Sequence, residues 1–210
     1  MSSLQRGWQL HQAGEYREAE VIYRQALLSP GQQANAWCYL GILFYDTGNY
    51  SDSLDAYEKA IALQPEFPVA LSNCANTLSA LERFEEAVAS CDAALALKPD
   101  YATAWTNLGA VRTKLGQFDE AADCFRKSLE VCPENNEPAH RNLGATFVRQ
   151  GRFQEGSEHT ARALQISPRN AEAHRNRAII KLLQADFDEG WDEYEWRWQC
   201  SDLSLPPFDV

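Results

Sequence analysis

Residues 36–65 read AWCYLGILFYDTGNYSDSLDAYEKAIALQP, and this stretch carries the pattern that decides the fold. In its first half, Trp37, Leu40 and Phe44 follow a spacing of three and four residues. That spacing places them on one face of a helix. The polar residues 46–49, Asp-Thr-Gly-Asn, then predict a turn.

The second half of the stretch predicts another helix. Leu54, Tyr57 and Ile61 again lie on one helical face. Pro65 ends this helix, because proline has no amide hydrogen to donate and disfavours helical backbone in the residue before it. The stretch is therefore expected to fold as two antiparallel helices joined by a tight turn.

The same pattern recurs along the whole chain. An aromatic residue returns at intervals of 34, 34, 34, 35 and 34 residues, and we expect it to pack between the paired helices. A glycine or alanine stands two places before it in every copy except one, where Glu82 occupies the position. The repeating aromatic residues are Tyr16, Tyr50, Phe84, Phe118, Phe153 and Phe187. A single helix pair cannot bury its apolar face, so such repeats must stack on one another.

The repeated series Trp-Leu-Gly, then Gly-aromatic, Ala, aromatic, Ala and Pro, resembles the tetratricopeptide repeat. The resemblance implies an all-α fold, a right-handed superhelical solenoid of about six antiparallel helix pairs, with the first helix of each pair lining the inner groove. The predicted array covers residues 1–199, and residues 200–210 form a tail or linker. The expected units are 1–33, 34–67, 68–101, 102–136, 137–170 and 171–199.

Asparagine recurs at a position that faces the groove in the family. We name Asn73, Asn107, Asn142 and Asn176 the asparagine ladder. An amide offers both a donor and an acceptor, so the ladder is predicted to hold the backbone of a partner peptide. The resemblance supports this, since similar asparagine ladders line O-linked N-acetylglucosamine transferases and hold substrate polypeptide. The alternative is that these amides support hydrogen bonding within each repeat. Asn76 is a further candidate groove residue.

The later repeats add basic side chains near the ladder. They favour a partner with an acidic or phosphorylated segment, through charge-assisted hydrogen bonds. The alternative is a solvated helix face whose cations pair with nearby glutamates. These candidate residues are Lys114, Arg141, Arg149 and Arg175. The Lys-Asn-Asn-Lys-Arg clamp of some tetratricopeptide co-chaperones is not reproduced.

The C-terminal end is rich in aromatic residues. We name Trp191, Tyr194, Trp196 and Trp198 the aromatic cluster. A helix through this segment would place Trp191, Tyr194 and Trp198 on one face and Trp196 elsewhere. A terminal repeat normally presents a polar outer face, so the cluster indicates a docking or self-association surface that could produce a homo-oligomer. The alternative is that the aromatic residues cap the array themselves.

The string GWDEYEWRW, residues 190–198, resembles the last repeat of bacterial tetratricopeptide proteins that continue into a glycosyltransferase-like domain. A proline-containing linker follows in those proteins, and Pro206 and Pro207 follow here. Arg177 and Lys181 stand where earlier repeats have apolar or aromatic residues. That departure indicates that the last helix pair packs differently or docks another domain.

Composition excludes several classes of protein. The net charge of −11 argues against general nucleic-acid binding, which needs clustered Lys and Arg. We find no apolar run long enough to span a membrane and no signal peptide at the N-terminus, so a cytoplasmic location is expected. The six cysteines contain no CxxC pair, which favours reduced core residues over disulfides or a metal site.

The chain shows no motif for catalysis, a cofactor or a metal ion. His140 and His174 replace the tryptophan of earlier copies, which favours packing roles over metal binding. The primary hypothesis is therefore a non-enzymatic scaffold that binds a protein or peptide segment in its concave groove. Two alternatives remain: a substrate-presenting module of a larger glycosyltransferase-like enzyme, and a self-assembling adaptor.

Overall fold

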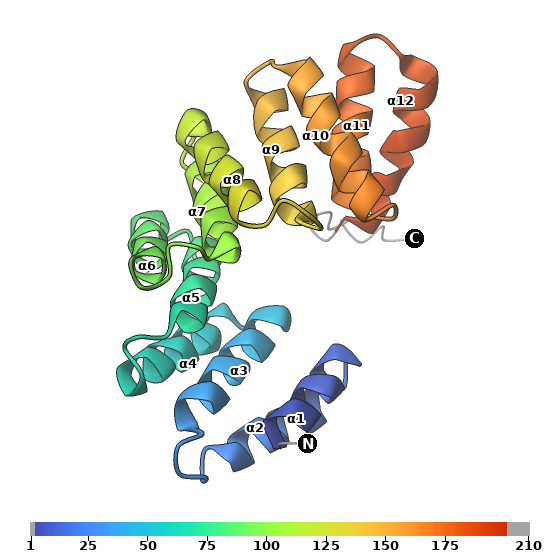
Figure 1. Cartoon of the computed structure of the whole chain (residues 1–210). Helices are drawn as coiled ribbons and strands as arrows, with labels where there is room; N and C mark the ends of the chain where they lie inside the picture. Colours follow the sequence, from blue (N-terminus) through green and yellow to red (C-terminus); the bar gives the residue numbers. More distant parts are fainter. Residues whose placement is uncertain (1–2, 201–210) are drawn as a thin grey trace. The chain divides into compact units, whose positions relative to one another are not determined.

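The computed structural model describes residues 3–200, and these residues form helices without any strand (Figure 1). Within this range, twelve α-helices are followed by one 3-10 helix. In chain order they are α1 (Ser3–Gln12), α2 (Tyr16–Ala26), α3 (Gln33–Asp46), α4 (Tyr50–Leu63), α5 (Pro68–Ala80), α6 (Phe84–Leu97), α7 (Ala102–Lys114), α8 (Phe118–Val131), α9 (Glu137–Arg149), α10 (Phe153–Ile166), α11 (Ala171–Leu183), α12 (Phe187–Tyr194) and η1 (Glu195–Gln199). The predicted all-α class, built from about six helix pairs, is confirmed.

The tight turns between paired helices share one backbone geometry. In each of the six turns a residue with positive φ is followed by a residue whose amide donates to a carbonyl five positions earlier, as Asn49 does to Phe44 at 2.7 Å. This pattern is the Schellman motif, which satisfies carbonyls left unpaired at a helix end. Four turns place glycine at positive φ, whereas Glu82 (φ 59°) and Ala185 (φ 63°) adopt this conformation with a side chain.

The repeating aromatic residue is the first residue of the second helix in every pair. It is half-buried in four copies. The exceptions are Tyr16, which is 39% exposed, and Phe187, which is 57% exposed. The expectation that it packs between the helices is therefore wrong for Phe187, which lies at the edge of the last pair. The tightest packing occurs instead about two helical turns further along, where Tyr23, Tyr57 and Phe125 are fully buried.

Small residues in the first helices let these buried rings approach. A Cβ atom added to Gly41 would lie 2.7 Å from the Tyr57 ring, and one added to Gly7 would lie 2.6 Å from the Tyr23 ring. Both distances are shorter than a van der Waals contact, so glycine is required for this approach. In these two pairs, the contact between a glycine and a buried tyrosine ring thus sets the distance between the helices.

The chain divides into two compact units at Val111, which lies within α7. In the first unit, Tyr23, Leu40 and Leu43 belong to one buried cluster, with Trp37 and Phe44 packed against it. In the second unit, a cluster contains Phe125, Leu143 and Phe147, and a smaller one joins Ala163, Leu164 and Ala173. Each unit therefore has its own apolar core.

Candidate binding surface

A cavity of about 310 Å³ lies among the first three helix pairs, inside the first unit. Helices α1, α3 and α5, which are the first helices of successive pairs, contribute most of its walls. Its lining residues are Trp8, Ile42, Tyr45, Asp46, Tyr57, Asn73 and Asn76. The cavity thus joins two predicted groove asparagines to aromatic rings and one carboxylate.

Two members of the asparagine ladder are used inside the array. Asn107 is buried, and its Nδ2 donates to both the carbonyl and the hydroxyl oxygen of Ser72, each at 3.0 Å. Asn176 Nδ2 donates to the carbonyl of Arg141 at 3.3 Å. Each bond reaches 35 residues back, from the first helix of one pair to that of the preceding pair. At these positions the amide braces neighbouring repeats.

The other two ladder members, Asn73 and Asn142, and the further candidate Asn76 keep amide atoms without a partner in the described part of the chain. Asn73 and Asn76 are half-buried in the cavity wall, and their amides have no hydrogen-bond partner within residues 3–200. Asn142 Oδ1 accepts a bond from Arg141 Nη1 at 3.0 Å, whereas no partner is seen for its amide nitrogen in that part of the chain. Within the described residues, Asn73 and Asn76 are thus the cavity asparagines whose amides make no internal hydrogen bond.

The four basic candidates all lie in the second unit and differ in their surroundings. Arg141 donates to Glu137 at 3.0 Å, and its side chain is 26% exposed. Lys114 and Arg149 are exposed, and Arg175 is half-buried. No ion pair of Arg149 occurs within the described part of the chain. The alternative of cations paired with glutamates therefore holds at Arg141.

The aromatic cluster does not lie on one continuous helix. Helix α12 ends at Tyr194, and residues Glu195–Gln199 form the 3-10 helix. The single α-helix on which the prediction placed Trp191 and Trp198 therefore ends before Trp198, which lies on the 3-10 helix. Arg197 instead connects the segment, with its guanidinium 4.7 Å from the Tyr194 ring centroid and 4.1 Å from that of Trp198.

Exposure divides the cluster into two groups. Trp191 and Trp198 are 57% and 50% exposed, whereas Tyr194 and Trp196 are half-buried. Trp196 stacks on His174 with ring centroids 4.0 Å apart. Trp196 thus anchors η1 to α11, and Trp191 and Trp198 present apolar surface.

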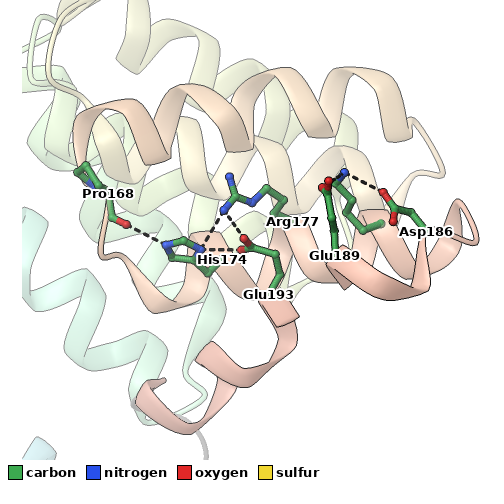
Figure 2. A network of polar contacts seen from close by, with 7 residues as sticks. Pro168, His174, Arg177, Asp186, Glu189 and Glu193 are labelled. Carbon is green, nitrogen blue, oxygen red and sulfur yellow. Dashed lines mark hydrogen bonds and ion pairs between the residues drawn. The ribbon is translucent and has the colours of Figure 1, made fainter. Parts of the chain in front are cut away.

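The last helix pair is held together by a polar network, shown in Figure 2. Arg177 forms an ion pair with Glu193, whose other oxygen lies 2.6 Å from His174 Nδ1. His174 Nε2 lies 2.8 Å from the Pro168 carbonyl oxygen. Burial by itself would raise the pKa of Glu193, but hydrogen bonds from Arg177 and His174 outweigh it and lower that pKa.

A second pair of contacts lies further along the same two helices. Lys181 Nζ contacts Asp186 Oδ2 at 2.9 Å and also forms an ion pair with Glu189 (Figure 2 shows both acceptors). Arg177 and Lys181 therefore remain directed toward α12. At these two repeat positions, charged contacts replace the apolar contacts of the earlier repeats. This explains why the sequence has Arg177 and Lys181 where earlier repeats have apolar or aromatic residues.

Two further histidines meet between α9 and α10. His140 Nδ1 lies 3.0 Å from His159 Nδ1, and the His159 ring also contacts Phe147. Burial lowers the pKa of His140 to about 4, with smaller contributions from His159 and Arg162. Burial also lowers the pKa of His159. The pair is thus kept without charge at neutral pH.

The cysteines behave as core residues. All six are free; five are buried, and Cys132 is partly exposed. Burial raises the pKa of Cys38 to about 12 and that of Cys74 to about 11, so these thiols resist forming the reactive thiolate. Within the described chain, no three His, Cys, Asp or Glu side chains gather in a way that would hold a metal ion.

Sequence reasoning missed the cavity because no single residue type marks it: Trp8, Ile42 and Asn76 stand at one repeat position but differ in chemistry, and the other members come from other positions. Trp8, Tyr45 and Asp46 each occur once in the pattern, and only packing brings them next to Asn73. One signal was available in the sequence. Tyr45 and Asp46 come directly after the apolar residues of their helix, where polar residues that line the groove would be expected to begin.

Stacked helical hairpins, fixed by glycine–aromatic packing and Schellman turns, define a helical-repeat protein with partly open first-helix surfaces. Family models described as tetratricopeptide repeat match residues 2–25, 34–67, 67–134 and 100–169. The chain belongs to the tetratricopeptide repeat family.

Two curated relatives match over short segments. A TPR repeat-containing thioredoxin, TTL4, of Arabidopsis thaliana is 47% identical over 51 residues, covering 24% of this chain and 8% of the relative. The probable biofilm formation methyltransferase WspC of Pseudomonas aeruginosa is 34% identical over 71 residues, covering 34% of this chain and 17% of the relative. The chain spans less than a fifth of either protein, so these matches concern the repeats.

Solved structures agree on the fold. TTC0263, a thermophilic TPR protein of Thermus thermophilus, has a TM-score of 0.75 at 22% identity, covering 85% of this chain and 97% of that one. PilW, described as a type IV pilus biogenesis factor, has a TM-score of 0.80 at 21% identity, covering 95% and 91%. YrrB, described as a TPR protein with an unusual peptide-binding site, has a TM-score of 0.57 at 19% identity, covering 84% and 91%.

The tetratricopeptide fold supports a role as a protein-interaction scaffold, with proteins or peptides as partners. Across residues 3–200, every helix is too short or too polar to cross a membrane. The absence of catalytic activity, the cytoplasmic location and a glycosyltransferase-like continuation stay predictions. So do the repeat boundaries, and the predicted tail at 200–210 lies outside the described residues apart from Cys200.

Proposed function

We propose that this protein binds an extended segment of a partner polypeptide along the first helices of its repeats. The observation that carries the proposal is the cavity lined by α1, α3 and α5, where Asn73 and Asn76 keep their amides free of partners within the described residues. Such amides can hydrogen-bond to a peptide backbone whatever its side chains are. The fold is also that of YrrB, a TPR protein with an unusual peptide-binding site, which supports the same class of ligand.

The asparagine ladder takes a divided role in this proposal. In the first unit Asn73 and Asn76 contact the peptide, and in the second unit Asn142 keeps its amide nitrogen available. Asn107 and Asn176 brace neighbouring repeats through Ser72 and Arg141 and so hold the surface in place. Removing a brace should weaken peptide binding mainly through lost stability, whereas removing Asn73 or Asn76 should weaken it directly.

We also propose a role for the basic side chains of the second unit in binding the partner. Arg149 is exposed and has no ion pair within residues 3–200, so it is the residue best placed to receive an acidic group of the partner. Lys114, Arg141 and Arg175 would assist it, although Arg141 must exchange its contact with Glu137. Exposed charges of this kind raise association rates more than they raise affinity.

Selection from a random peptide library displayed on phage tests the proposal with the full chain. We expect selected peptides to bind and to lose at least tenfold affinity for the Asn73→Ala/Asn76→Ala variant. The matched control is Asp55→Ala/Lys59→Ala, which removes an exposed ion pair on the second helix α4 and should leave affinity unchanged. Recovery of no binding peptide, or equal loss in both variants, would overturn the proposal.

A second candidate function is self-association through the last repeat. The observation that favours it is the exposure of Phe187, Trp191 and Trp198, each at least half exposed. Large aromatic residues at a surface are typical of protein interfaces. In this alternative two copies of the chain pack their α12 helices together, and the protein acts as an assembling adaptor.

A further inference from the structure

The cavity of the first unit has one charged group in its described lining. That group is Asp46, and the remaining walls are aromatic, aliphatic and amide groups. Asp46 Oδ2 lies 2.9 Å from His11 Nε2, and the side chains of these residues are 43% and 4% exposed respectively. The buried imidazole thus fixes the orientation of a carboxylate that remains open to solvent.

The tyrosines beside Asp46 stay neutral. Burial raises the pKa of Tyr45, with further contributions from Tyr50 and Asp46. Burial also raises the pKa of Tyr57, and Asp46 is again among the charges that add to it. The carboxylate therefore has phenol groups beside it, and the negative charge in the cavity stays that of Asp46.

The walls suit a cation on an apolar stem. The Trp8 ring is held by contacts to His11 and Tyr39, with ring centroids 5.2 and 5.8 Å away. Indole and phenol faces attract ammonium and guanidinium groups, and Ile42 can cover methylene carbons. An apolar occupant would strip water from Asp46 without compensation, and an acidic one would be repelled.

We propose that this cavity binds a lysine or arginine side chain of the partner polypeptide, with its cation at Asp46 and its stem against Trp8 and Ile42. The proposal rests on the peptide-binding function proposed above and names the partner residue that the first three repeats select. The net charge of −11 favours the approach of a basic segment.

The surroundings also suit the backbone on either side of that residue. Trp8 is shared with a second cavity of about 480 Å³, whose other lining residues are Gln5, Gln9, Gln12 and Tyr39. Glutamine amides can donate to and accept from a peptide backbone, as asparagine amides can. The partner segment would thus place a basic side chain beside Asp46 and continue over the glutamine side chains of α1.

Nuclear magnetic resonance with short probes tests the proposal. The probes are acetylated, amidated pentapeptides Gly-Gly-Xaa-Gly-Gly in which Xaa is lysine, arginine, norleucine or glutamate. We expect the lysine and arginine probes to shift the Trp8 indole resonance, identified with the Trp8→Phe variant. Norleucine should bind at least fivefold more weakly because it lacks the cation, and glutamate should produce no shift.

Variants locate the effect in the cavity. Asp46→Asn should weaken binding of the lysine probe at least fivefold, whereas Asp52→Asn, an exposed carboxylate on α4, should not. Because Asp46→Asn also alters the contact with His11, Asn76→Lys serves as a second variant, which places a tethered ammonium in the cavity and should abolish probe binding. The melting temperature of each variant reports whether it is folded.

Equal binding of lysine and norleucine probes, or unchanged binding by folded Asn76→Lys, would overturn the lysine or arginine site. Library peptides that bind through Asn73 and Asn76 without a basic residue would do the same, while leaving the peptide-binding function intact. Failure of the library selection would overturn that function separately.

Discussion

At the scale of single residues, the inter-helix turns show which side chains conflict with the backbone they occupy. Positive φ costs an ordinary L-residue about 1–2 kcal/mol, because Cβ approaches the following carbonyl oxygen. Glycine avoids this cost in four of the six turns, but Glu82 and Ala185 do not. The repeat geometry is therefore imposed on these two residues by the helices around them.

The substitution Glu82→Gly should stabilise the protein by about 0.5–1 kcal/mol, because relief of the strained φ exceeds the entropy that glycine loses on folding. Chemical denaturation measures the change. The control is Glu58→Gly, an exposed position inside α4, which should destabilise by about 1 kcal/mol. A loss of stability in Glu82→Gly would contradict the strain argument.

At the scale of helix pairs, the second unit uses polar contacts between helices where apolar ones would serve. Arg177 and Glu193 connect α11 to α12, and His140 meets His159 between α9 and α10. Such contacts depend on the charge of their members, whereas packed aliphatic groups do not. We therefore expect the stability of the second unit to depend on pH in the acidic range.

Stability of the second unit should fall as pH decreases from about 6.5 toward 4. The pKa of His140 is lowered to about 4 in the folded protein, so across this window the unfolded chain binds a proton that the folded chain does not. His159 acts in the same direction. We expect His140→Leu to reduce the slope of the unfolding free energy against pH.

Nuclear magnetic resonance of the histidine side chains during a pH titration gives a direct check. We expect both His140 and His159 to titrate with a pKa below the ordinary histidine value. The leucine replacement matches Leu71, which occupies this repeat position in another copy. An unchanged slope in His140→Leu, or a His140 pKa near the ordinary histidine value of about 6.5, would show that the pair does not control acid stability.

At the scale of the whole molecule, two properties bear on association with other proteins. One is the acidic balance of the chain, with a net charge of −11 and basic candidates confined to the second unit. The other is the exposed aromatic surface of the last repeat. We expect the first to influence the approach of charged partners and the second to favour association through apolar contact.

If the last repeat associates, sedimentation of the full chain should show a concentration-dependent increase in mass. The variant Phe187→Ala/Trp191→Ala should remain a monomer at concentrations where the wild type assembles, because more than half of each ring is exposed for contact. Leu28→Ala/Leu63→Ala removes two exposed leucines of the first unit and is the matched control. A monomeric wild type at all concentrations would exclude this function.

The repeat period was sufficient to predict the helix pairs, their order and the turns between them. It succeeds because every copy has to bring its two helices together, as Gly41 does against the Tyr57 ring, before it can stack on its neighbours. The period also located the asparagine ladder. It did not show that Asn107 and Asn176 donate hydrogen bonds to the preceding repeats. An asparagine that recurs at one repeat position can bind a peptide or bond to a neighbouring repeat, and the sequence looks the same in both cases.

The local sequence of this protein specifies helices, turns and the family to which it belongs, because these follow from spacings of a few residues repeated along the chain. Packing in three dimensions determines which polar groups remain available. Asp46, Trp8 and Asn73 become one cavity only when helices far apart in sequence lie together. Hydrogen-bond partners depend on distances between repeats, and those distances are set by the side chains that fill the space between helices.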